Sequence, residues 1–225
     1  MKQLPHYSGH RKRLKDRLTQ EPMLLPDYEV LELLLGYGLP RRDTKKLAKD
    51  LLAEFKTVEG VLGARDAALL NITGFGPGLL TFWKVLREIW ARKLASDIAP
   101  REQINSPSKV AALAAARLGP LASEEFWVIL VDNKNRFLAF EQVSRGTVDQ
   151  TPVYPREVLA RAFTHQASGM MLVHNHPGGD PTPSSQDMDL TRRISQVATD
   201  VGIRVLDHLV VAESRYFSFQ EQGLL

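Results

Sequence analysis

Two histidines and an aspartate in the last third of the sequence have the types and spacing of a metal site. His174 and His176 follow the apolar run Met-Leu-Val, and Asp187 comes after a loop rich in proline and glycine. Side chains on a β-strand alternate between its two faces, so both imidazoles would point to one side and reach one ion. Two nitrogens and one carboxylate oxygen leave a fourth tetrahedral position for water, as in a catalytic zinc site that lowers the pKa of that water.

A second interpretation of the same stretch needs no metal. His-x-His occurs by chance, and Ser184 followed three residues later by Asp187 is also the pattern of a helix capping box. A buried strand, His-x-His, a glycine-rich loop and a carboxylate nevertheless all fall close together, between residues 174 and 187. This combination favours the metal site over the capping box alone.

The composition limits which groups can hold an ion and where the protein works. The 225 residues include no cysteine, which excludes disulfides, thiolate zinc fingers, iron–sulfur clusters and a cysteine nucleophile. Any metal must be bound by His, Asp or Glu. The first residues lack the apolar core of a secretory signal, and no apolar run approaches the ~20 residues that span a bilayer. We therefore expect a cytoplasmic protein that makes no contact with membranes.

The hydrophobic pattern predicts an α+β fold with two domains. Up to about residue 95 apolar residues recur at helical spacing, whereas later β-rich runs alternate with helices. We predict a basic N-terminal arm over 1–20, an all-helical domain over 21–95, a linker over 96–105 and a mixed α/β domain over 106–225. The expected strands are 126–131, 137–143, 147–154, 169–173, 205–211 and 216–219; the expected helices of this domain are 110–118, 155–165 and 189–201.

In the helical domain, Asp27 is the expected cap of one helix and Thr44 the expected start of a second, and a glycine-rich turn precedes a long helix. Gly74, Gly76 and Gly78 lie between an apolar residue and an amphipathic run, which is the layout of a helix-hairpin-helix. Such glycines allow a sharp turn, and the free N–H groups of the following helix can bind a DNA phosphate. No cation follows the turn until residue 84, so a structural or protein-docking hairpin stays the alternative.

The N-terminal arm is the other candidate for nucleic-acid contacts. Six Lys or Arg residues lie between positions 2 and 17, against one acidic residue. Arg11, Arg13 and Lys15 are the residues that we expect to meet phosphates, because clustered cations attract the DNA backbone. A solvated helix face that only aids solubility is the alternative.

Longer stretches of the sequence resemble the RadC family. His174-x-His176, seven further residues and Ser184-x-x-Asp187 match the metalloprotease motif of the JAB/MPN domain. The run from His174 to Ser184, the segment Val-Leu-Asp-His208 and the segment 27–35 narrow the resemblance to RadC proteins, historically called DNA-repair proteins. The resemblance covers nearly the whole chain. It implies a helix-hairpin-helix domain in front of a JAB/MPN (cytidine-deaminase-like) domain, although the repair label is an association and not a mechanism.

The resemblance also implies roles for individual residues. His174, His176 and Asp187 would bind Zn²⁺, and Ser184 would donate a hydrogen bond to the oxyanion formed when water attacks a carbonyl. JAB/MPN enzymes carry a general base, a Glu, where an early strand begins. We assign this role to Glu124, which strand alternation places on the face of Phe126. Glu125 and Glu157 are the competing assignments.

Two functional hypotheses follow. In the first, the protein is a zinc-dependent metallohydrolase that cleaves a peptide or isopeptide bond of a protein or peptide substrate with metal-activated water. In the second, the hairpin and the arm bind DNA and the metal is structural. Asn175 replaces the Ser of many deubiquitinating relatives, so their substrate preference does not transfer. The oligomeric state is left open.

Four further residues near these segments have plainer expected roles. We expect His208 to be a buried imidazole bonded to backbone, with a supporting role beside the metal site as the alternative. Asp180 is expected to stabilise its loop, His165 to cap a helix, and Asn175 to be structural.

Overall fold

A computed structural model describes residues 7–21, 24–97, 107–146 and 153–225 of the chain. It divides into two units, 1–86 and 87–225, which are described separately below. The long helix α6 (Pro77–Asp97) begins in the first unit and ends in the second. The linker predicted over 96–105 lies mostly outside the described residues.

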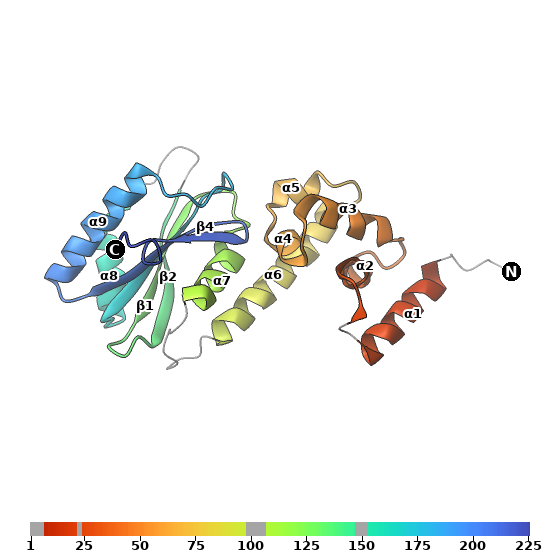
Figure 1. The fold of residues 1–225 in the computed structure, drawn as a ribbon, viewed down its shortest axis with the longest axis horizontal. Coiled ribbons are helices and arrows are strands. Elements are labelled where there is room, and N and C mark those ends of the chain that lie inside the picture. The colour runs from red at the N-terminus through yellow and green to blue at the C-terminus, as the bar shows by residue number, and fades with distance from the viewer. Residues whose placement is uncertain (1–6, 22–23, 98–106, 147–152) are drawn as a thin grey trace. The chain divides into compact units, whose positions relative to one another are not determined.

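Five helices and the start of α6 build the first unit (Figure 1). The apolar faces of α2 to α5 and of the start of α6 meet around the fully buried Trp83, whose indole N–H donates to the carbonyl of Val61 (3.3 Å) and whose ring lies edge-on to Phe75. Gly74 has a positive φ of 96°, so the turn before α6 uses a conformation that favours glycine. The helices are α1 (Tyr7–Gln20), α2 (Asp27–Gly38), α3 (Lys45–Phe55), α4 (Val58–Gly63) and α5 (Asp66–Leu70).

The described part of the predicted basic arm is helix α1, which is attached to the rest of the first unit. Leu14 is buried in a small cluster with Leu25 and Leu33. The Arg11 guanidinium donates to the carbonyls of Pro40 (2.9 Å) and Arg42 (2.7 Å), just beyond the end of α2. Arg11 therefore holds a loop of this unit, and a phosphate would have to compete with these bonds.

A five-stranded mixed sheet forms the second unit, in the order β2-β1-β3-β4-β5. β1 is antiparallel to β2 and to β3, β3 is parallel to β4, and β4 is antiparallel to β5. The unit therefore has the mixed α/β character that the sequence predicts. The strands are β1 (Glu125–Val131), β2 (Phe137–Arg145), β3 (Gly169–Asn175), β4 (Arg204–Ala212) and β5 (Arg215–Ser218).

Helices cover both faces of this sheet. α7 (Pro107–Leu118) packs on one face, with Ala114 beside Ile129 and Val173, whereas α8 (Pro155–Thr164) and α9 (Ser185–Asp200) pack on the other. Figure 1 shows α8 and α9 together on the side opposite α7. Every residue of β3 is buried, because this strand is central and covered on both faces.

Most predicted elements are present, with shifts at their ends. Pro26 occupies the N-cap of α2, so Asp27 lies inside the helix and is not its cap. α9 begins at Ser185, four residues before the predicted start, because Ser184 and Asp187 form the capping box that extends the helix. The strand predicted over 147–154 lies mostly outside the described residues. In the part of the chain that is described, no helix is long and apolar enough to cross a membrane.

Candidate metal centre

The side chains of His174, His176 and Asp187 meet at one point of the second unit. The two Nε2 atoms lie 3.0 Å apart, and Asp187 places Oδ1 3.2 Å from Nε2 of His174 and Oδ2 3.4 Å from Nε2 of His176. Ligands about 2.0–2.1 Å from a tetrahedral ion are about 3.3 Å from one another. The separations in this cluster are therefore those of three ligands around one ion, and these side chains could hold a metal together.

Strand β3 brings the two imidazoles to the same side, as the period of two predicts. His174 pairs with Phe126 of β1, and the two rings stack with centroids 6.0 Å apart. The backbone N–H of His176 donates to the carbonyl of Val211 (2.8 Å), so β4 still supports the chain just past the end of β3. The side chain of His174 is 1% exposed and that of His176 is 20% exposed. The cluster thus opens to solvent on the side of His176.

Hydrogen bonds at the Nδ1 atoms fix which nitrogen of each ring faces the cluster. Nδ1 of His176 lies 2.9 Å from the carbonyl oxygen of Asp180, which can only accept, so Nδ1 carries the hydrogen. The Thr191 hydroxyl donates to the carbonyl of Asp187 (2.6 Å) and therefore accepts from Nδ1–H of His208 (2.5 Å). Nε2 of His208 then accepts from Nδ1–H of His174 (2.8 Å). This network therefore assigns a lone pair to Nε2 of His174 and to Nε2 of His176, the two nitrogens that face the cluster.

The donor set fits a divalent cation. Two nitrogen lone pairs 3.0 Å apart repel each other unless a positive charge lies between them, and a carboxylate stands beside both. Imidazole nitrogens with a carboxylate oxygen are ligands that zinc accepts, with a fourth position open. His174, His176 and Asp187 are thus the residues that would hold the ion.

Asp187 is held in place by Ser184, the N-cap of α9. The Ser184 N–H (2.7 Å) and hydroxyl (2.6 Å) both donate to Oδ2 of Asp187, and Asp187 N–H donates back to the hydroxyl (3.1 Å). Burial acts to raise the pKa of Asp187, but the adjacent imidazoles of His174 and His176, which can donate to the carboxylate when Nε2 is protonated, outweigh it and hold the pKa well below its usual range. The capping box therefore exists, and it presents an ionised carboxylate to the two histidines.

Two histidines of the network, His176 and His208, have opposite pKa shifts. The adjacent Asp187 carboxylate favours a hydrogen on Nε2 and so raises the pKa of His176 above the ordinary value, with smaller contributions from the Asp180 carbonyl and the charge of Glu124. Burial lowers the pKa of His208 well below the ordinary value, and the neighbouring His174 lowers it further. His208 is accordingly a neutral ring, as its hydrogen bonds to His174 and Thr191 require.

Glu124 and Glu125 have different surroundings. The Glu125 carboxylate is buried and accepts from Trp127 Nε1 (2.9 Å) and Gln142 Nε2 (2.9 Å), with Arg145 Nε 3.3 Å away. Glu124 is exposed, and its charge acts on His176. Within the described residues its carboxylate makes no hydrogen bond or ion pair. The geometry thus favours Glu124 over Glu125 as the group that faces the cluster, while Glu157 is an exposed residue in the first turn of α8.

Sequence reasoning missed the partners of His208. The favoured expectation of a ring bonded to backbone is wrong, because both ring nitrogens contact side chains, those of His174 and Thr191. Thr191 was not predicted either, although it follows Asp187 by four residues and so lies on the same face of α9. The loop role of Asp180 agrees with the structure: its carboxylate accepts from the N–H and the hydroxyl of Thr182. His165 ends α8 as expected and also contacts Glu141 (3.1 Å).

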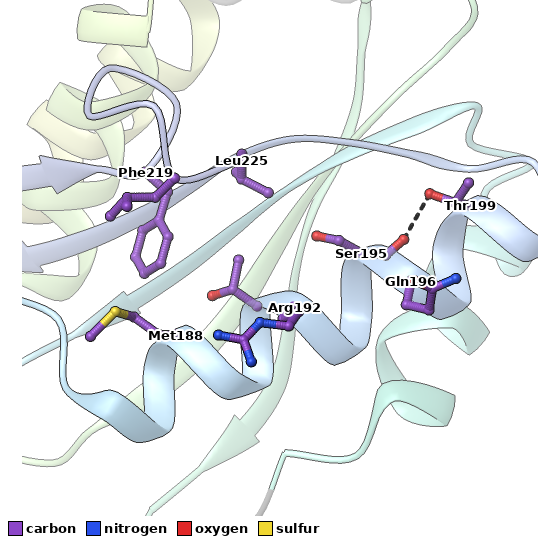
Figure 2. Close-up of a pocket in the computed structure, with 9 residues that line it drawn as sticks. Met188, Arg192, Ser195, Gln196, Thr199, Phe219 and Leu225 are labelled. Atoms are coloured by element: carbon purple, nitrogen blue, oxygen red, sulfur yellow. Dashed lines mark hydrogen bonds between the residues drawn. The ribbon is translucent and has the colours of Figure 1, made fainter.

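A cavity of about 390 Å³ lies behind this network, between α9 and the C-terminal residues. Figure 2 shows Phe219 from the chain after β5 pointing towards α9 near Met188, with Arg192, Ser195 and Gln196 farther along the helix. Phe219 also stacks on His208, with ring centroids 4.8 Å apart. The described residues that line the cavity include none of the three candidate ligands. The cavity therefore adjoins Phe219, which stacks on His208, and not the point where the candidate ligands meet.

Similar proteins are known for this chain. A family model described as "RadC-like JAB domain" matches residues 104–224, which include the whole cluster. A UPF0758 protein of Ruegeria pomeroyi is 40% identical over 224 residues, a match that covers 99% of this chain and 100% of that protein. The similarity to this relative therefore extends over both units.

Proposed function

Since the chain belongs to the RadC family, whose matched region is a JAB-type domain, we propose that it is a zinc-dependent hydrolase that cleaves a peptide or isopeptide bond. The observation that carries this proposal is the meeting of two imidazole nitrogens and an ionised carboxylate within reach of the charge of Glu124, an exposed glutamate that makes no hydrogen bond or ion pair with the described residues. A zinc-binding role without hydrolysis would not need the carboxylate of Glu124.

Each residue of the cluster has a part in the proposed reaction. His174, His176 and Asp187 hold the ion, which when bound lowers the pKa of a water and polarises a substrate carbonyl. The Glu124 carboxylate takes a proton from the water while the oxygen of the water bonds to the carbonyl carbon. The carboxylate then gives that proton to the amide nitrogen. The carbon–nitrogen bond breaks, which leaves a carboxylic acid and an amine.

Ser184 has two duties in this proposal. In the structure its hydroxyl donates to Asp187, which fixes the carboxylate. To donate to the developing oxyanion, the hydroxyl hydrogen must turn from Oδ2 of Asp187 towards the substrate, while the Ser184 N–H keeps its bond to the same oxygen (2.7 Å). Loss of one oxyanion donor typically lowers kcat about 10²–10³-fold.

Metal content and bond cleavage test the proposal separately. We expect about one zinc per chain by elemental analysis, and loss of the metal in the double variant His174→Ala/Asp187→Ala. A mixture of peptides made from a digested proteome, incubated with the protein in H₂¹⁸O, should acquire ¹⁸O at new C-termini. Glu124→Gln should keep the metal and lose the cleavage, and Glu157→Gln, at an exposed glutamate in the first turn of α8, serves as the matched control. Unchanged metal in the double variant, or cleavage that survives Glu124→Gln, would contradict the proposal.

A DNA-binding role for the first unit is the second candidate function, and a cleft in that unit favours it. A cleft of about 610 Å³ is lined by Arg41, Arg42 and the glycine-rich turn before α6. The first-turn N–H groups of a helix have no partner within the helix, so an anion can bind them. The first cation after the turn, Lys84, is paired with Asp66 (2.8 Å), so the arginines are the cations of this cleft.

Salt dependence of binding tests this second candidate. Fluorescence anisotropy with single-stranded and branched DNA should show affinity that falls with salt. Arg42→Glu should weaken the affinity and make the salt slope shallower by about 1 for each phosphate that the variant no longer neutralises. Lys109→Glu on α7 is the control, since it makes the same charge change in the second unit. No binding at low salt, or equal binding by both variants, would exclude a DNA-binding cleft.

A further inference from the structure

At the start of β1, the side-chain amide of Asn175 takes the place of a backbone hydrogen-bond partner from β3. Backbone pairing between β1 and β3 ends at Phe126 and His174. Glu125, the residue of β1 that precedes Phe126, donates its N–H to Oδ1 of Asn175 (2.8 Å) instead. Asn175 is 1% exposed and lies between the two histidines of the cluster in sequence. Its side chain thus extends the strand pairing by one residue.

The other end of the same amide holds the residue before Glu124. Nδ2 of Asn175 donates to the carbonyl of Ser123 (3.1 Å), so one side chain binds backbone groups on both sides of Glu124. From the opposite strand, the N–H of Gly146 donates to the carbonyl of Glu124 itself (2.8 Å). Three of the backbone groups around Glu124, the carbonyls of Ser123 and Glu124 and the N–H of Glu125, are therefore fixed by neighbours.

The side chain of Glu125 prevents the backbone of residues 123–125 from rotating about its own axis. Its buried carboxylate is bound by Trp127 and Gln142, and a rotation that brought Glu125 towards the cluster would break both bonds. The Glu124 side chain is exposed and makes no bond to the described residues, and its charge acts on His176. Its direction thus depends on its backbone, because its carboxylate has no anchor of its own.

We propose that Asn175 is a positioning residue for Glu124, which holds the general base at a fixed place relative to the two histidine ligands. The inference rests on the proposed function, in which Glu124 moves the proton. Asn175 belongs to the strand that orients both imidazoles, so a single residue couples the placement of the ligands to that of the base. Asparagine suits this task because it offers one acceptor and one donor side by side; aspartate lacks the donor and alanine lacks both.

The test uses the full chain loaded with Co²⁺, whose visible absorption changes with the protonation of the non-protein ligand and needs no substrate. The variants are Glu124→Gln, Asn175→Ala and the double variant, with Asn175→Ser in reserve if the alanine variant does not fold. Thr44→Val is the matched control: Thr44 is also buried and its hydroxyl donates to a backbone carbonyl, that of Glu32 (2.8 Å), in the first unit. Metal affinity and exchange of the Glu125 N–H are measured on the same samples.

Removal of the nearby negative charge in Glu124→Gln should move the midpoint of the absorption change to lower pH by about one unit. Asn175→Ala should move it in the same direction by at least about half as much and speed exchange of the Glu125 N–H, while the Co²⁺ affinity stays within about threefold of the parent, because all three ligands remain. The double variant should show no shift beyond that of Glu124→Gln. Thr44→Val should leave the midpoint unchanged.

The outcomes separate this inference from the function on which it rests. A shift in Glu124→Gln without one in Asn175→Ala or Asn175→Ser overturns the positioning role and leaves the hydrolase proposal standing. Shifts that simply add in the double variant also overturn it, because Asn175 would then act independently of Glu124. If Glu124→Gln shows no shift, Glu124 does not act on the metal-bound water. That result would contradict both the positioning role of Asn175 and the hydrolase proposal.

Discussion

At the scale of single residues, a group on another strand determines which nitrogen of His174 faces the candidate metal site. His208 accepts the Nδ1 hydrogen of His174, and its own Nδ1 hydrogen is bound by Thr191. The ring of His208 lies between Phe126 and Phe219, with centroids 5.7 and 4.8 Å away, so it cannot turn without moving an aromatic side chain. An acceptor that is itself immobile makes His174 a preorganised candidate ligand.

Replacement of His208 should therefore weaken metal binding without removing a ligand. We expect His208→Phe, which cannot accept a hydrogen bond, to lower zinc affinity about 10–100-fold, the usual cost of losing the partner of a ligating histidine. Competition with a chromophoric chelator measures the affinity. His165→Phe is the control, because His165 contacts Glu141 (3.1 Å) and not the cluster. Equal zinc affinity of His208→Phe and the parent protein would show that the His174–His208 bond does not orient the ligand.

At the scale of secondary-structure elements, the strand and helix that carry the ligands were predictable, whereas the contacts between elements were not. The period of two along 174–176 placed both imidazoles on one face, and the same alternation separated Glu124 from Glu125. Thr191 and His208 are 17 residues apart in sequence, and His174 and His208 are 34 apart. Over such separations the sequence pattern does not predict which residues lie opposite one another. The two bonds of Asn175 span 50 and 52 residues and were hidden for the same reason.

The turn between β1 and β2 shows how one carboxylate organises a hairpin. Asp132 Oδ1 accepts the N–H groups of Lys134 (2.8 Å) and Arg136 (2.9 Å), and Oδ2 accepts Arg136 Nε (2.6 Å). The Arg136 side chain is the main cause that lowers the pKa of Asp132 to about 2, helped by the two backbone bonds. An ordinary aspartate in an unfolded chain has a pKa of about 3.9. The ionised form is thus favoured in the folded protein.

This shift makes the contribution of Asp132 to stability depend on pH. Because the folded pKa is below the unfolded one, the contribution is complete above about pH 5 and is lost as pH falls through about 4 towards about 2. The difference in urea unfolding free energy between the parent and Asp132→Asn should therefore be largest near neutral pH and shrink across that range. A difference that stays constant down to about pH 3 would mean that the turn does not depend on the charge.

The end of α7 approaches the β4–β5 turn too closely for a side chain. A Cβ on Gly119 would lie 2.1 Å from the carbonyl oxygen of Glu213 and 2.6 Å from that of Ala115, both backbone atoms. We expect Gly119→Ala to destabilise the second unit by at least about 2 kcal/mol, because backbone must move to relieve the overlap. A Cβ on Gly178 meets nothing within 4 Å, so Gly178→Ala is the control. Equal urea midpoints for the two variants would contradict the close approach.

At the scale of the whole molecule, the chain consists of two units with separate cores. Trp83 and the surrounding helices form the core of the first, and the two faces of the sheet carry the cores of the second. The three candidate ligands come from β3, the chain just after it, and α9, all within residues 87–225. The free energy of metal binding should therefore stabilise the second unit alone.

Hydrogen exchange of the full chain with and without zinc tests this expectation. A ligand that binds only the folded unit stabilises it by about 2.7 kcal/mol at a free concentration one hundred times its Kd. Exchange should slow in β3, β4 and the first turns of α9 when zinc is added, because these elements hold the ligands and His208. The helices α2 to α5 should exchange at unchanged rates, since no ligand lies among them. The double variant His174→Ala/Asp187→Ala should show no response to zinc anywhere, and slowing that persists in this variant, or that reaches α2 to α5 equally, would place the metal elsewhere in the molecule.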